Sequence, residues 1–129
     1  MDYKLITLSN SLRLLIVPMP FLQSATVSVW VKAGSRNESD DKLGLSHFLE
    51  HMAFKGGKKY PSAKAVSEAI DEVGGEFNAS TSKEVIQYYI RIRSKLIEKA
   101  FDVLSDIVIN PNLDEKEIVK EKGVILEEM

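Results

Sequence analysis

The chain contains two histidines, His47 and His51, which stand four residues apart. On a helix, residues at this spacing point to the same side, with Cβ atoms about 5–6 Å apart. Two neutral imidazoles at that distance can bind one zinc ion through their ring nitrogens. The segment GLSHFLEHMAFKGG, residues 44–57, therefore predicts a metal site on a helix.

Glu50 stands directly before His51 and lies on the same side of that helix. Its position is a poor one for a third ligand, but it is close enough to meet a water bound to the metal. Zinc makes such a water more acidic, and an adjacent carboxylate can take the proton when the water attacks a carbonyl. The order H-x-x-E-H is the inverted form of a zinc-protease motif, so it predicts a hydrolase with Glu50 as general base.

A different interpretation of the two histidines stays open. A single helix histidine is more often a surface or core residue than a ligand, and a short motif also arises by chance. The chain would then be a plain α+β module whose histidines only pack. Replacing both histidines by alanine would in that case change stability but not metal content.

A catalytic zinc site needs a third protein ligand and leaves one position for water. The chain has no cysteine and no further histidine, so this ligand must be an aspartate or a glutamate. The last predicted helix offers Glu115, Glu117, Glu121, Glu127 and Glu128.

Helical rotation of about 100° per residue sorts these glutamates. Ile118, Glu121, Ile125 and Glu128 fall on one stripe, whereas Glu127 points roughly opposite, toward solvent. An inward carboxylate needs a partner, because burying an unpaired charge is costly. We therefore expect Glu128 to be the third ligand. Glu121, two turns earlier, is better placed to orient a histidine.

The elements that must position these residues can be read from hydrophobic periodicity. Strand-like patterns cover residues 3–8, 12–17, 25–33, 76–81 and 85–92. Helical patterns cover residues 42–54, 62–73, 94–109 and 114 to the chain end. Paired strands and segregated helices, without strict βαβ alternation, predict an α+β fold with a mostly antiparallel sheet and helices packed on one face.

Caps and inner faces of the helices follow from the same pattern. Ser62 is expected to cap the second helix, and Asp114 with Glu117 forms an acidic capping pair for the last. The expected inner residues of the first helix are Leu45, Leu49 and Met52. Those of the third helix are Ile97, Phe101, Leu104 and Val108.

Composition excludes several classes of function. The absence of cysteine rules out disulfides, thiolate zinc sites and cysteine nucleophiles. A net charge of −2 gives no strong attraction to nucleic acid or to an anionic membrane, so neither is expected as a partner. No apolar run approaches the ~20 residues that span a bilayer. The N-terminus has neither a secretory nor a transit pattern, and we expect a cytoplasmic protein.

Three motifs in order resemble the N-terminal portion of the pitrilysin-type metallopeptidases: GLSHFLEHMAFKG, GGEFNASTSKE and EKGVILEEM. That family includes insulin-degrading enzyme and the β subunit of mitochondrial processing peptidase. The resemblance covers nearly the whole chain. In the family, H-x-x-E-H is followed by a glutamate a little over seventy residues later, and Glu128 lies 77 positions after His51.

The resemblance implies a set of roles at the metal. His47, His51 and Glu128 would bind one zinc ion per chain, and Glu50 would be the general base. Glu121 matches a second family glutamate seven residues before the ligand. The residues alone do not exclude cobalt or manganese, because similar ligand sets accept several ions.

The resemblance also implies a substrate site. Asn78 and Ala79 match an edge strand that holds the substrate backbone as an added strand in such enzymes. Glu84 and Tyr88 fit the family pattern as well, but we assign them no role.

At the level of the whole protein, the resemblance implies a LuxS/processing-peptidase-like fold. Family members are much longer, so residues 1–129 are expected to be the N-terminal part of a catalytic domain. The implied activity is zinc endopeptidase cleavage of unfolded peptides or presequences, which needs the rest of the chain or a homologous half or subunit. The alternative is a noncatalytic scaffold or partner subunit, which need hold no stoichiometric zinc.

Overall fold

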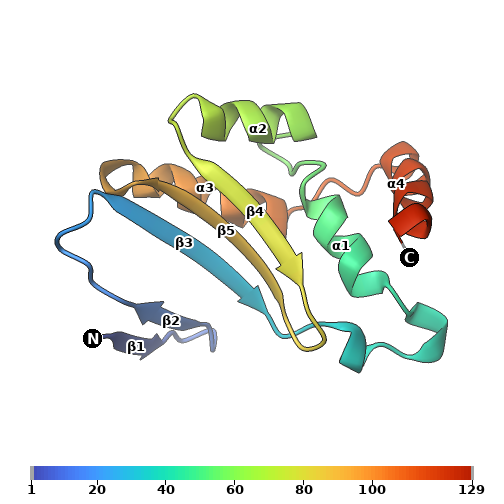
Figure 1. Cartoon of the computed structure of the whole chain (residues 1–129), viewed down its shortest axis with the longest axis horizontal. Helices are drawn as coiled ribbons and strands as arrows, with labels where there is room; N and C mark the ends of the chain where they lie inside the picture. Colours follow the sequence, from blue (N-terminus) through green and yellow to red (C-terminus); the bar gives the residue numbers. More distant parts are fainter. Residues whose placement is uncertain (1, 129) are drawn as a thin grey trace.

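The central sheet of the computed structural model, which describes residues 2–128, has three antiparallel strands in the order β3–β5–β4 (Figure 1). These strands are β3 (Ser24–Val31), β4 (Glu76–Thr81) and β5 (Ile86–Arg93). A separate antiparallel hairpin is formed by β1 (Lys4–Thr7) and β2 (Arg13–Ile16). All five predicted strands are therefore confirmed, and β4 lies at one edge of the central sheet.

The helices are α1 (Leu45–Ala53), α2 (Ala63–Asp71), α3 (Ile97–Ile109) and α4 (Glu115–Glu128). In Figure 1, α3 crosses behind the sheet, whereas α1 and α4 lie side by side beyond the β4 edge. The combination of an antiparallel sheet with segregated helices confirms the α+β prediction. Among the helices of residues 2–128, none has both the length and the apolar character needed to cross a membrane.

The hydrophobic core lies between β5, α2 and α3. Alternate residues of β5 are buried because one face of the strand meets the helices. The core residues contributed by α3 are Ala100, Val103, Leu104 and Ile107. The expected inner face of this helix was therefore wrong in part, since Phe101 is 51% exposed. Apolar residues occur on both sides of α3, so periodicity alone could not fix which side faces the sheet.

Helix α1 begins at Leu45, three residues later than predicted. Gly44 has a φ of 88°, a left-handed conformation that glycine adopts easily and that ends the preceding turn. The expected inner face also needs correction, because only its last turn reaches the core. Met52 is fully buried, whereas Leu45 and Leu49 are 43% and 42% exposed.

Side-chain caps were predicted for α2 and α4, and both helices start at a side chain that accepts backbone N–H groups. Ser62 Oγ accepts the Ala65 N–H at 3.2 Å at the start of α2. Asp114 Oδ1 accepts the N–H groups of Lys116 and Glu117 at 2.9 and 3.3 Å before α4. The Ser62 cap and the Asp114 half of the second prediction are confirmed, whereas the Glu117 carboxylate faces Lys55. The Asp114 cap fixes the start of the helix that carries Glu121 and Glu128.

Candidate metal centre

Helices α1 and α4 bring the three predicted ligands together. The Nε2 atoms of His47 and His51 are 3.0 Å apart, and Glu128 Oε2 lies 3.7 Å from each of them. Within residues 2–128, these three side chains form a cluster that could hold a metal ion, because each offers one ligand atom and these atoms lie within 4.8 Å of one another. Glu128 comes from the C-terminal end of α4, so the packing of two helices distant in sequence creates the group.

The residues of this group fit a zinc ion. Ligand atoms about 2.0–2.2 Å from a tetrahedral zinc lie roughly 3.3–3.5 Å from one another, and the observed separations fall on both sides of that value. Two imidazole nitrogens and one carboxylate oxygen form a donor set of catalytic zinc sites. All three side chains are partly exposed within residues 2–128.

Glu121 fixes the orientation of His51. Its Oε1 accepts a hydrogen bond from His51 Nδ1 at 2.7 Å, so the Nε2 lone pair faces His47 and Glu128. Glu121 is 5% exposed, and this burial opposes ionisation. Hydrogen bonds from Lys55 and His51 outweigh that effect and lower the pKa of Glu121. Glu121 is therefore a buried, ionised acceptor at neutral pH.

Lys55 is a contributor that the sequence analysis missed. Its Nζ lies 2.5 Å from Glu121 Oε2 and 3.8 Å from a Glu117 carboxylate oxygen, and its side chain is mostly buried. The available signal was its position four residues after His51, just past the C-terminal end of α1 at Ala53. Lys55 provides the cation that a buried carboxylate needs.

Glu50 lies beside the ligand group and faces the sheet. The hydroxyl of Thr81, the last residue of β4, donates a hydrogen bond to Glu50 Oε2. Burial, with a smaller effect of the Glu50 charge, raises the pKa of Tyr88 to about 12. Tyr88 thus stays neutral beneath the site. Thr81 was not identified from the sequence, because nothing in a strand pattern indicates which helix a terminal threonine meets.

Asn78 and Ala79 lie on β4, opposite Tyr89 and Tyr88 of β5. Asn78 is exposed and its Oδ1 accepts the Ala79 N–H at 2.8 Å. Because β4 is an edge strand within residues 2–128, its second side offers backbone groups to a further strand. The two residues predicted for substrate binding therefore lie on an available edge beside α1.

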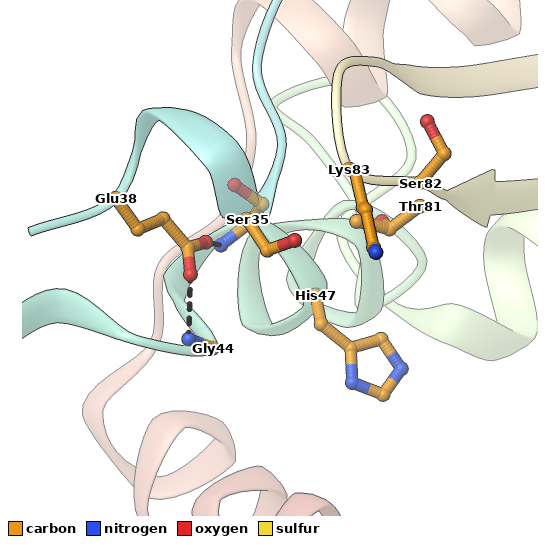
Figure 2. A pocket seen from close by; sticks show the side chains of 8 residues that line it. Ser35, Glu38, Gly44, His47, Thr81, Ser82 and Lys83 are labelled. Atoms are coloured by element: carbon orange, nitrogen blue, oxygen red, sulfur yellow. Dashed lines mark hydrogen bonds between the residues drawn. The ribbon is translucent and has the colours of Figure 1, made fainter. Parts of the chain in front are cut away.

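A cavity of about 400 Å³ adjoins the His47 side of the centre (Figure 2). It lies between the loop before α1 and the β4–β5 turn, where Thr81 and Lys83 line it. Figure 2 shows the Glu38 carboxylate bonded to Gly44 on the opposite wall. Glu84, left without a role in the sequence analysis, forms an ion pair with Arg36 that joins the same loop to the turn.

Comparison with known proteins matches residues 13–129 to the family model "Insulinase (Peptidase family M16)". A Rickettsia felis protein named "Uncharacterized zinc protease" is 43% identical over 128 residues, which cover 99% of this chain and 31% of that protein. The Arabidopsis thaliana "Probable mitochondrial-processing peptidase subunit beta, mitochondrial" is also 43% identical, with 99% of this chain and 24% of that protein covered.

The fold is likewise similar to a solved protease. The crystal structure of a protease from Helicobacter pylori matches with a TM-score of 0.92 and 32% identity, covering 98% of this chain and 30% of that one. This chain thus spans about a third or less of the length of these relatives.

Proposed function

The chain belongs to the insulinase family of metallopeptidases, peptidase family M16, and from that premise we propose that it carries the zinc site of an endopeptidase. The single observation that carries the proposal is the convergence of His47, His51 and Glu128 from two helices. The names of the relatives, zinc protease and processing peptidase, support the same activity. Residues 1–129 would form the N-terminal part of the catalytic domain.

His47, His51 and Glu128 would hold one zinc ion through Nε2, Nε2 and a carboxylate oxygen. The chemistry that zinc supplies in such a site is Lewis acidity, which makes water more acidic and polarises a carbonyl. Glu121 keeps the His51 Nε2 lone pair directed at this position by accepting the Nδ1 proton. Lys55 keeps Glu121 ionised, so that it remains an acceptor.

Glu50 would move the proton during hydrolysis. Its carboxylate takes a proton from the attacking water as the water oxygen bonds to the peptide carbonyl carbon. The protonated Glu50 then gives this proton to the amide nitrogen as the C–N bond breaks. One water is consumed, and a new carboxyl and a new amine result. Glu50 suits this role because Thr81 engages Oε2 and leaves Oε1 for the proton.

The substrate would be an unfolded peptide or a presequence bound along β4. An edge strand binds a segment in extended conformation through main-chain hydrogen bonds, and an unfolded peptide can readily adopt that conformation. Asn78 and Ala79 lie at the middle of that strand and would contact the peptide backbone. The remainder of the protein, or a homologous half or subunit, would close the site over the peptide.

Replacing Glu50 by glutamine in the complete natural protein tests the proposal. Loss of the general base should lower hydrolysis of an unfolded fluorogenic peptide by about 10²–10⁴-fold. Metal analysis should still give one zinc per chain, because Glu50 is outside the ligand group. Undiminished turnover would overturn the role of Glu50. A wild-type protein without stoichiometric zinc or hydrolysis would instead support the noncatalytic scaffold.

A further inference from the structure

The strand that offers its edge to substrate also contacts the proposed base. Thr81 ends β4, and its hydroxyl donates to Glu50 Oε2 across 31 positions of sequence. Both side chains are half-buried, so bulk water competes only partly for this hydrogen bond. A hydroxyl bonded to an ionised carboxylate forms one of the stronger classes of hydrogen bond.

The position of Thr81 follows from the pleat of β4. Phe77, Ala79 and Thr81 occupy the half-buried alternate positions, whereas their neighbours are exposed. Phe77 and Ala79 pack on the core, and Thr81 is the polar member of the row. The row meets α1 beside the sheet, so its last residue lies opposite the α1 position that carries Glu50.

The backbone holds Thr81 firmly in this place. Thr81 pairs with Ile86 at the end of the ladder, and Ser82 donates its N–H to Val85 O at 2.9 Å in the turn that follows. Threonine is branched at Cβ, which restricts χ1 and so restricts where its hydroxyl can lie. The hydroxyl is therefore a fixed point, whereas the long side chain of Glu50 has several rotatable bonds.

We propose that Thr81 is a positioning residue, which holds the Glu50 carboxylate in the orientation that proton transfer requires. The inference rests on the proposed function. It adds that one strand does two tasks, because Asn78 and Ala79 would hold the peptide backbone while Thr81 holds the base. A peptide paired with β4 would then be positioned by the same strand that positions the Glu50 carboxylate.

The test compares Thr81→Val, which keeps the shape and removes the hydroxyl, with Thr81→Ser, which keeps the hydroxyl. Both are made in the complete natural protein and assayed with an unfolded fluorogenic peptide. Thr81→Val should lower kcat by about 10- to 100-fold, since small misplacement of a catalytic group has effects of this size. KM should change by less than about twofold, because the β4 backbone is intact. Thr81→Ser should retain most of kcat.

A matched control is Thr26→Val, the same change at an exposed position of β3, which should leave kcat unaltered. If Thr81→Val does not fold, Thr81→Ala is compared with Thr81→Ser in its place. A readout independent of turnover is the crystal structure of each variant without zinc. Glu50 should stay on the hydroxyl in the wild type and in Thr81→Ser, and should leave this orientation in Thr81→Val.

The outcomes separate the two proposals. A wild-type protein that hydrolyses no peptide overturns the proposed function, and the inference with it. If the wild type is active, wild-type turnover by Thr81→Val, or equal impairment of Thr81→Ser and Thr81→Val, overturns the positioning role alone. An unchanged Glu50 conformation in Thr81→Val would also overturn it.

Discussion

Glu121 Oε1 lies 2.7 Å from His51 Nδ1, although the two residues are separated by 70 positions of sequence. This contact joins α4 to α1 two turns before Glu128 on the same helix. Glu121 engages one nitrogen of the His51 ring, while Glu128 faces the other nitrogen at 3.7 Å. The ring is thus held between two carboxylates of one helix, and this determines where Glu128 meets the histidines.

Replacing Glu121 by glutamine should weaken zinc binding by about 10- to 100-fold, the usual effect of removing the partner of a ligating histidine. The amide is a weaker acceptor for Nδ1–H than a carboxylate. Competition with a chromophoric chelator measures the affinity. Glu115→Gln, at the exposed start of α4, is the matched control and should bind zinc normally. Equal affinity in both variants would contradict the role given to Glu121.

Lys55→Met should destabilise the protein by about 1–3 kcal/mol, because it leaves the buried Glu121 carboxylate without its cation. Chemical denaturation of the zinc-free protein measures the free energy of unfolding. Lys58→Met changes an exposed lysine of the following loop and serves as control. A cost no greater than that of the control would show that His51 alone satisfies Glu121.

Glu38→Gln should destabilise α1 by about 0.5–2 kcal/mol, since Glu38 accepts the Ser46 and Gly44 N–H groups at 2.6 and 2.7 Å in place of an N-cap side chain. The reason for a pH dependence is that hydrogen bonds, chiefly from Ser46, lower the pKa of Glu38 below its ordinary value of 4.5. A lowered folded-state pKa contributes stability above that ordinary value, and the contribution is lost as pH falls through the folded pKa.

The stability difference between wild type and Glu38→Gln should therefore be constant near neutrality and shrink below about pH 4.5. Urea denaturation at several pH values measures it. Asp40→Asn, which makes the same charge change at an exposed position of the short 3-10 helix Asp40–Lys42, is the control. Its stability difference from the wild type should not shrink in this way. A difference that does not vary with pH would contradict the proposed ionised contact.

If the substrate peptide binds as a strand added to β4, the effect of an N-methyl group on KM should depend on which peptide residue carries it. Methylation at residues whose N–H groups face β4 should raise KM, by up to about tenfold for each hydrogen bond lost. Methylation at the alternate residues should have little effect, because their N–H groups face away. A steady-state series on the complete protein measures this. Equal effects at all positions would exclude strand addition.

Much of the centre could be predicted from sequence because it depends on local geometry. Helical spacing places His47, Glu50 and His51 on one side of α1, and the same rule places Glu121 and Glu128 on one stripe of α4. The structure brings these two faces together. Thr81 and Lys55 could not be paired with their glutamates, since these contacts depend on how β4 and α4 approach α1.

The fold shows the same division between local and long-range information. The strand segments, the approximate helix bounds and the caps at Ser62 and Asp114 followed from periodicity and turn residues, whereas the strand order β3–β5–β4 was not predicted. The inner face of α3 did not follow either, because Phe101 was expected inside, whereas Ala100, Val103 and Ile107 fill the core. Only packing against the sheet decides between these apolar sides of the helix. The first turn of α1 was misplaced for a similar reason, as its start depends on Glu38 in the preceding loop.

The hydrophobic core between β5, α2 and α3 contains none of the three proposed ligands. In small zinc-dependent domains the ion supplies the folding free energy, so the chain unfolds when the ion leaves. Here the scaffold can form first and receive its ion afterwards. Metal supply would then set how many folded molecules are competent, while each bound ion adds to the stability of a scaffold that already exists.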